Sequence, residues 1–194
     1  MSVDNLPQGG NDVKGFPFPD QVESRRELER DILFDKIPPE HRVIISDNAW
    51  KTGVEAAHDL FLKYDKKITM EQIANKSGLI VERQYKDQVI AGQRYFAEYY
   101  SGRNRIILYT ESIGKWAREN LLASILAEEL ILAHEFYHFL ECTKLGLTSK
   151  QYLVPVLKIG SLVLVRSGVR TLSEIGAHGF SRTFYELRGS ITSR

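Results

Sequence analysis

The segment from Leu132 to Glu141, LAHEFYHFLE, contains two histidines four positions apart and a glutamate directly after the first. On a helix, residues four apart lie one turn apart on the same face, so the imidazoles of His134 and His138 can converge on one metal ion. Glu135 points about 100° around the helix, from where it can reach a water molecule on the metal without binding the metal itself. In such an H-E-x-x-H motif the metal activates water and polarises a scissile carbonyl group. Glu135 then takes the proton of the water and passes it to the leaving amine.

The alternative explanation is that these residues are polar members of a buried helix. The flanking sequence LLASILAEELILAHEF is strongly apolar, which predicts a helix that is mostly buried. Burying two histidines and a glutamate without partners costs on the order of several kcal/mol. Because a metal ion removes that cost, the sequence favours a zinc site, and Mn²⁺ is a second ion that such ligands accept.

A third metal ligand must come from elsewhere, because one helix cannot surround a tetrahedral ion. The candidates are Glu141, Cys142, Glu174 and His178. Glu141 and Cys142 lie about one turn beyond His138 on the same helix, and their side chains move away from the metal. We expect Cys142 to be a small buried apolar residue and Glu141 to accept a ring N–H from a ligand histidine.

The better source is the segment TLSEIGAHGFSRTFYELRG, which begins at Thr171. Glu174 and His178 share one face of the helix predicted there, and small residues around His178 allow a close approach to the histidine helix. We therefore expect Glu174 to complete a His₂Glu site with one position open for water. A capping box between Thr171 and Glu174 is the alternative. His178 is expected either to stabilise an oxyanion or donate a proton, or to be an ordinary surface or supporting histidine.

The elements that hold these residues follow from the spacing of apolar positions. Residues 1–42 are predicted to form a flexible amino-terminal leader with room for a short helix, and residues 43–194 a single domain. The order within the domain is helix, helix, small antiparallel sheet, long helix, connector and helix, which is the α+β class. The predicted segments are a helix from Asp47 or Asn48 to residue 64, a capped helix at 69–78, strands in LIVERQY, QRYFAEYY and RIILYT, a helical stretch from Lys115 to Leu145 interrupted near Glu119 or Asn120, and a helix from Leu172 to Arg188.

The composition excludes several classes of protein. Twenty-six basic residues against 25 acidic ones leave a net charge of +1, so no global field favours nucleic acid or an anionic membrane. The single cysteine excludes an internal disulfide framework. The opening segment lacks the apolar run of a secretory signal, and the most apolar stretch, Leu153–Val165, is shorter than the roughly 20 residues of a spanning helix. We expect a cytoplasmic protein in which Leu153–Val165 belongs to the core rather than to a lid, a cleft wall or a dimer contact.

From about residue 50 to 188 the chain resembles the ImmA/IrrE family of gluzincin-type zinc metallopeptidases. The similar stretches, in the family's order, are AAHDLFLKY, EQIANKSGLIVE, RIILY, AHEFYHFL and EIGAHGF, the last of which matches E-x-x-A-x-x-F. The resemblance implies a zincin-like fold in which the small sheet packs on the active-site helix. It implies zinc bound by His134, His138 and Glu174, with Glu135 as the general base. It also implies limited proteolysis of a partner, often a helix-turn-helix transcriptional repressor.

The chain departs from the family in ways that affect the shape of the cleft. Bulky Phe136 and Tyr137 stand inside the motif, the connector at 146–170 is long and apolar, and Ser181 replaces an alanine. Two other classes of function are alternatives: a regulatory or protein-binding module with a structural metal, and a DNA-binding protein whose histidines are accidental. Aromatic and basic residues do alternate along residues 83–106, but a two-faced strand pair explains that pattern better.

The sequence therefore predicts a zinc endopeptidase whose partner is a protein or peptide substrate. We expect no direct nucleic-acid binding and no membrane segment, and the oligomeric state stays open. An extended substrate peptide is expected to pair with the strand RIILYT as the edge of the sheet.

Overall fold

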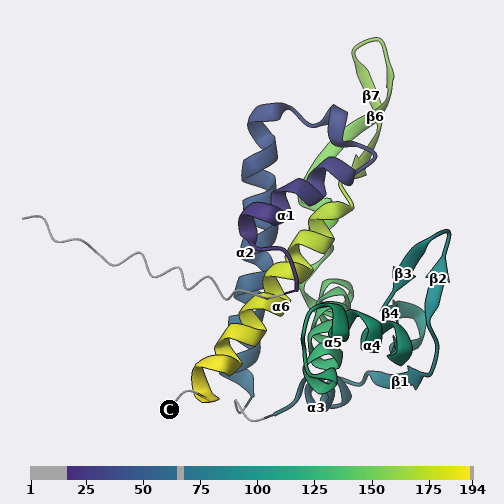
Figure 1. Ribbon diagram of the computed structural model, residues 1–194. Helices are drawn as coiled ribbons and strands as arrows, with labels where there is room; N and C mark the ends of the chain where they lie inside the picture. Colours follow the sequence, from purple (N-terminus) through teal and green to yellow (C-terminus); the bar gives the residue numbers. More distant parts are fainter. Residues whose placement is uncertain (1–16, 65–67, 193–194) are drawn as a thin grey trace, which may run out of the picture.

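The computed structural model describes residues 17–64 and 68–192 and has a mixed α+β structure, as the sequence predicted (Figure 1). The helices are α1 (Gln21–Glu27), α2 (Pro39–Lys63), α3 (Met70–Lys76), α4 (Thr110–Glu119), α5 (Ser124–Leu140) and α6 (Thr171–Thr192). The strands are β1 (Ile80–Gln84), β2 (Gln88–Ile90), β3 (Gln93–Tyr95), β4 (Ala97–Tyr100), β5 (Arg105–Tyr109), β6 (Leu153–Ile159) and β7 (Leu162–Gly168). Short 3₁₀ turns at Leu28–Arg30 and Phe34–Lys36 follow α1, and a π-helical turn at Glu141–Leu145 follows α5.

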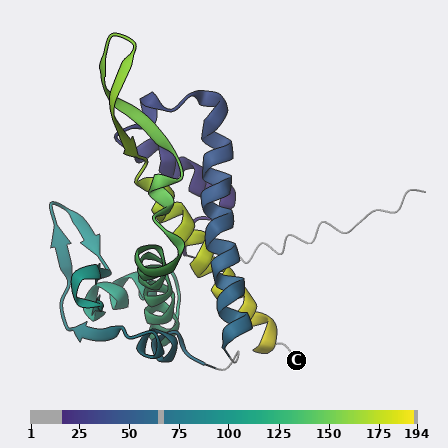
Figure 2. The ribbon, with the colours of Figure 1, turned by 180° about the vertical axis from the view of Figure 1, so that it is seen from behind.

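Helices α2 and α6 lie side by side, as both views of the ribbon show (Figures 1 and 2). Their backbones touch at glycines. A Cβ atom on Gly53 would overlap the carbonyl oxygen of Gly176, and one on Gly179 would lie 2.6 Å from the carbonyl oxygen of Trp50. Gly176 also packs against the ring of Tyr137 in α5. The small residues of α6 therefore bring this helix close to α5, as predicted, and against α2 as well.

Helix α2 begins earlier than the sequence analysis predicted. Pro39 occupies its first turn, where a missing N–H and a fixed φ are tolerated, so the helix begins at this residue and not at Asp47 or Asn48. Asp47 instead lies inside α2 and forms a bidentate ion pair with Arg25 of α1. The predicted boundary between residues 42 and 43 thus falls within a helix.

The described part of the leader packs against the rest of the chain. Leu28 and Ile37 are each 1% exposed in a small core that they share with residues of α2 and α6. Asp31 ties the leader to the start of α6, because its Oδ2 accepts hydrogen bonds from the backbone N–H and the hydroxyl of Thr171 at 3.0 and 3.2 Å. Residues 1–16, which the leader prediction also covers, lie outside the described residues.

Strand β5 is the centre of a three-stranded sheet with the order β1-β5-β4, and its Ile106 and Leu108 are fully buried. The prediction of an antiparallel sheet is correct for β4 but wrong for β1, which runs parallel to β5. The prediction that RIILYT is the sheet edge is also wrong. The central position suits β5, the most apolar strand of this sheet, because a strand there is covered by neighbours on both sides. Strand β4, which contacts α5, forms one edge of the sheet.

Several local predictions are confirmed. Thr69 and Gln72 form the capping box at the start of α3, and Gly78 adopts a φ of 84° just after its end. The long helical stretch is interrupted at the predicted place, since α4 ends at Glu119 and Leu121 has a φ of 56° before α5 begins. The main core lies between these helices, the sheet, α6 and the second half of α2.

The apolar segment predicted to join the core is instead the β6–β7 hairpin, which projects away from the body (Figure 1). Leu157, Ile159 and Leu162 are 50%, 69% and 62% exposed, and within these two strands Val154 alone is buried. The core prediction is therefore wrong for this segment: the two strands pair with each other, and no third strand of the described chain joins them. Among the described residues, no helix combines the length and apolar character needed to cross a bilayer.

Candidate metal centre

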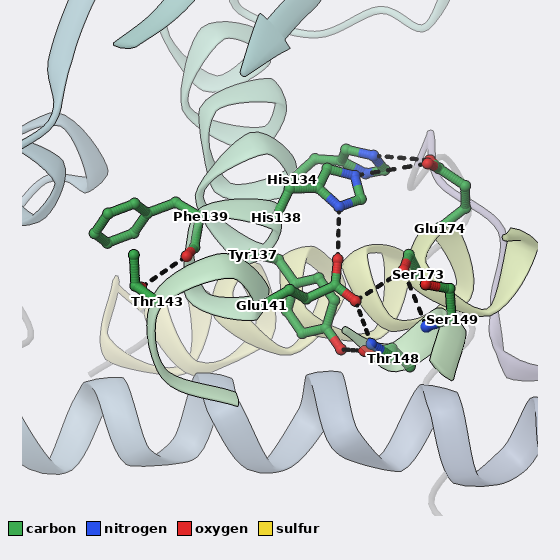
Figure 3. Close-up of polar contacts among 10 residues, drawn as sticks. All are labelled: His134, Tyr137, His138, Phe139, Glu141, Thr143, Thr148, Ser149, Ser173 and Glu174. Carbon is green, nitrogen blue, oxygen red and sulfur yellow. Dashed lines mark hydrogen bonds and ion pairs between the residues drawn. The ribbon is translucent and has the colours of Figure 1, made fainter. Parts of the chain in front are cut away.

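Helix α5 presents His134 and His138 on one face, with ring centroids 5.1 Å apart (Figure 3). Leu130, Phe136 and Tyr137 of the same helix are buried in the main core. The helix is rich in leucine, alanine and glutamate, which have high helix propensity. Local sequence thus forms the helix, and the spacing of four places the two imidazoles together.

Glu174, in the first turn of α6, approaches both histidines. Its Oε2 lies 3.2 Å from His134 Nε2, and its Oε1 lies 3.7 Å from His138 Nε2. One ligand atom from each of the three residues lies within 4.8 Å of the others. The alternative capping box is not formed, because the Thr171 backbone N–H, which would donate to the Glu174 side chain in such a box, donates to Asp31 instead. The structure therefore brings together the three residues predicted to bind a metal.

A buried carboxylate orients the second histidine. Glu141 is 3% exposed, and His138 Nδ1 lies 2.9 Å from its Oε2, so the ring nitrogen donates to it. Glu141 Oε1 accepts hydrogen bonds of 2.8 Å from the Thr148 backbone N–H and the Ser173 hydroxyl (Figure 3). Since Nδ1 is occupied, Nε2 of His138 faces Glu174. This is the role of ring acceptor that the sequence suggested for Glu141.

The donor set fits a zinc ion. Two neutral imidazole nitrogens and a carboxylate are a common zinc ligand set, and metal–ligand distances of about 2.0–2.1 Å separate tetrahedral ligands by about 3.3–3.4 Å. The distances of 3.2 and 3.7 Å from Glu174 oxygens to His134 and His138 bracket that spacing. His134 Nδ1 is buried with no hydrogen-bond partner among the described residues, so the orientation of this ring depends on what its other nitrogen contacts.

The charges at the centre favour a cation. Burial acts to raise the pKa of the Glu174 carboxyl, but its hydrogen bond with His134 and the nearby imidazoles lower it to about 2. Burial acts to lower the pKa of His138, while Glu141 and the other carboxylates raise it to about 9. Carboxylates thus draw positive charge to this point, which a divalent cation supplies.

Glu135 lines the same cleft as the three ligand candidates. Burial raises the pKa of its carboxyl above the ordinary value, although His134, His138 and a backbone hydrogen bond with Tyr99 act in the opposite direction. A carboxyl group whose pKa is raised toward the working pH is a better proton acceptor. Glu135 thus lies in the cleft of the three ligand candidates, and the pKa of its carboxyl is above the ordinary value.

His178 lies one turn beyond Glu174 on α6, with its ring centroid 5.3 Å from that of His134. It lines the cleft, so it is not an ordinary surface histidine. Burial, together with the neighbouring imidazole of His134, lowers the pKa of His178 to about 3, which keeps its imidazole neutral. His178 is not part of the group that brings three ligand atoms together.

The cleft around the centre has a volume of about 790 Å³. One wall is formed by β3, Phe96 and residues 97–99 of β4, and the base by α5 and the first turns of α6. Trp116 of α4, the leader residues Pro17–Pro19, and Glu27 and Arg30 also line the cleft. The centre is therefore open to a ligand of peptide size.

One candidate ligand is placed elsewhere. Cys142, predicted to be a buried apolar residue, is exposed on the π-helical turn after α5 and takes no part in the centre. The prediction is wrong because the helix changes its winding at Glu141, which turns the buried position to that residue. Thr148 and Ser173, which hold Glu141, were not identified from the sequence, because nothing local distinguishes them from other hydroxyl residues.

Comparison of the chain with known proteins identified no relative. No protein-family model, no curated protein and no solved structure matches the chain. What is assigned to the site therefore depends on the geometry of His134, Glu135, His138 and Glu174 and on the resemblance of the motifs.

Proposed function

We propose that this protein is a zinc-dependent endopeptidase of the kind that the ImmA/IrrE resemblance implies. The observation that supports this most directly is the convergence of His134, His138 and Glu174, with Glu135 in the same cleft. A zincin-like relationship for the α+β fold belongs to the same proposal. So do the cytoplasmic location and a protein or peptide substrate such as a transcriptional repressor, for which the sequence arguments remain the support.

The reaction is hydrolysis of a peptide bond. Zinc held by His134, His138 and Glu174 would supply Lewis-acid chemistry, which lowers the pKa of water and polarises the substrate carbonyl. Glu135 accepts one proton of the attacking water at a carboxylate oxygen and donates it to the nitrogen of the leaving amine. The C–N bond breaks as a C–O bond forms, and the other hydrogen of the water stays with the new carboxyl group.

Two further residues assist without accepting the proton of the water. Glu141 holds His138 through Nδ1 and so directs Nε2 to the centre. His178 is a neutral imidazole in the cleft, and its buried Nδ1 has no hydrogen-bond partner in the described part of the chain. We propose that it donates a ring N–H to the carbonyl oxygen as negative charge develops, since a pKa near 3 disfavours the protonated ring that a proton donor needs.

Strand β4 is the proposed guide for the substrate backbone. It pairs with β5 on one side, has no second strand partner among the described residues, and its residues 97–99 line the cleft. An extended peptide can add to such an edge through backbone hydrogen bonds, with its scissile bond directed to the centre. This replaces the predicted role of β5, which is central.

The test combines zinc content with hydrolysis of an internally quenched peptide library. We expect the wild-type protein to contain stoichiometric zinc and to hydrolyse members of the library. Glu135→Gln should retain zinc and lose about 10²–10⁴-fold in rate, because the general base is removed. Glu128→Gln, on the same helix but paired with Arg83, is the matched control and should leave both quantities unchanged.

Three outcomes would contradict the proposal. A zinc-loaded wild-type protein without hydrolysis of any library member would favour the regulatory module with a structural metal. Equal hydrolysis by wild type and Glu135→Gln would remove this residue as the base. Absence of stoichiometric metal together with salt-sensitive duplex binding would favour a DNA-binding protein.

A further inference from the structure

The leader places an aromatic side chain inside the cleft of the metal centre. The ring of Phe18 stacks on His178 with a centroid distance of 5.5 Å and an interplanar angle of 27°. Its centroid lies 5.7 Å from that of His134 and 5.5 Å from that of Trp116. Trp116 in turn packs against Phe96 at 5.5 Å. Phe18 is therefore surrounded by rings from α4, α5 and α6.

These rings form a defined aromatic subsite. Rings with centroids 4.5–7 Å apart attract each other beyond simple burial, and their geometry selects flat side chains over branched aliphatic ones. The rings that receive Phe18 belong to elements that also position the centre: His134 is a ligand candidate, and His178 follows Glu174 by one turn. A side chain bound here therefore lies directly beside the position of the scissile bond.

The segment that carries Phe18 is held at the cleft by contacts on its carboxyl side. Asp20 caps α1 directly after Pro19, with its side chain accepting from the Glu23 backbone N–H. Arg25 then pairs with Asp47 of α2, and Asp31 binds the first residue of α6. Pro17 and Pro19 flank Phe18, and each restricts its own φ. A ring tethered in this way has a high effective concentration at the subsite.

We propose that this pocket is the specificity subsite for an aromatic side chain of the substrate, and that Phe18 occupies it as a tethered competitor. A role of this pocket in substrate recognition rests on the endopeptidase proposal, whereas its binding of an aromatic peptide does not. The ligand class is an extended peptide with a Phe, Tyr or Trp next to the bond to be cleaved. Such a peptide must displace Phe18 before it reaches His134 and His178.

The test measures peptide binding in the Glu135→Gln background, so that no hydrolysis intervenes. The probe is the acetylated, amidated peptide GFPFPD, which copies residues 15–20, and the control peptide is GAPAPD, in which alanine replaces both phenylalanines. Titration calorimetry should show that Phe18→Ala binds GFPFPD at least about tenfold more tightly than the parent, because the competitor is gone. Phe18→Tyr should resemble the parent, and Val22→Ala, at a leader position that is 61% exposed, is the matched control.

Phe18→Leu is a second variant for the case that Phe18→Ala does not fold, since leucine keeps the apolar bulk without a ring. It should also bind GFPFPD more tightly than the parent. Thermal unfolding of each variant identifies any that fails to fold. The proposal is overturned if neither Phe18→Ala nor Phe18→Leu binds GFPFPD more tightly than the parent. It is equally overturned if GAPAPD binds as well as GFPFPD.

The two proposals fail in different ways. Tight binding of GFPFPD by Phe18→Ala in the Glu135→Gln background, together with a zinc-loaded Phe18→Ala protein with Glu135 intact that hydrolyses nothing, leaves the aromatic subsite and removes the endopeptidase. Hydrolysis of library peptides with no preference for aromatic residues leaves the endopeptidase and removes the subsite. If both hold, Phe18→Ala with Glu135 intact should lower KM for aromatic peptides and leave kcat nearly unchanged.

Discussion

Two apolar stretches of this chain have opposite fates. Ser124–Leu140 forms α5, where Leu130 and Phe136 are each 1% exposed. The β6–β7 hairpin has a comparable run of leucine, isoleucine and valine, yet Ile159 and Leu162 are more than half exposed. Helix α5 is contacted by α3, α4, α6 and two strands, whereas β6 and β7 contact mainly each other.

The difference shows that apolar composition does not decide burial by itself. A helix with neighbours on several sides loses water from most of its surface, while a two-stranded ribbon has two faces and nothing to cover them. The comparison also concerns polar groups. His138 of α5 can be partly buried and Glu141 fully buried because each has a hydrogen-bond partner. The hairpin needs no such network because it is exposed.

The largest expected change in the free energy of unfolding comes from a substitution in the buried helix α5. Leu130→Ala should lower the free energy of unfolding by about 2–5 kcal/mol, because it removes apolar contacts and leaves a cavity in the main core. Urea unfolding of the chelator-treated protein measures the change. A loss below about 0.5 kcal/mol would mean that α5 is not packed as described.

The variant Glu141→Gln tests the hydrogen-bond network at the end of α5. The variant removes the negative charge that holds His138 Nδ1, and loss of such an outer partner typically lowers metal affinity by about 10–100-fold. Competition for zinc against a chelator of known affinity measures it. Glu128→Gln on the same helix is the control, and equal affinities in the two variants would contradict the orienting role.

The contact between α5 and α6 is tested by Gly176→Ala. The new Cβ would meet the Tyr137 ring, which cannot move freely because its hydroxyl is hydrogen bonded to Thr148. We expect a loss of about 1–3 kcal/mol in the free energy of unfolding, as is usual for overpacking. Gly114→Ala in α4, where the new Cβ would only touch the end of Arg118, should be neutral or stabilising by up to about 1 kcal/mol.

The smallest effect is expected in the hairpin. Ile159→Ser and Leu162→Ser should each change the free energy of unfolding by less than about 0.5 kcal/mol, because both side chains are already exposed to water. The same urea experiment measures them beside Leu130→Ala. A loss of 2 kcal/mol or more in either variant would mean that these side chains form buried contacts, which would contradict the contrast drawn between the hairpin and α5.

Local features were predictable because they depend on neighbours in the chain. The capping box of α3 needs only Thr69 and Gln72, and the meeting of His134 with His138 needs only a helix between them. The start of α2 was missed although it is local, since Pro39 is compatible both with ending a helix and with beginning one.

The features that join distant segments could not be predicted with the same force. The parallel pairing of β1 with β5 depends on how the chain crosses the sheet, and the exposure of the hairpin depends on the absence of a covering neighbour in the described chain. The exposed position of Cys142 follows from the change of winding at Glu141, which periodicity does not reveal.

By itself, the sequence determined a helix with an H-E-x-x-H motif and an α+β order of elements, because periodicity and capping act over a few residues. The sequence favoured Glu174 as the third ligand, but the tertiary structure was needed to bring it up to both histidines. The tertiary structure alone decided that Thr148 and Ser173 hold the carboxylate behind His138. It also decided that Phe18 lies in the cleft. Those contacts depend on the packing of α6 and the leader against α5, and packing is set by the shapes of surfaces that only the folded chain brings together.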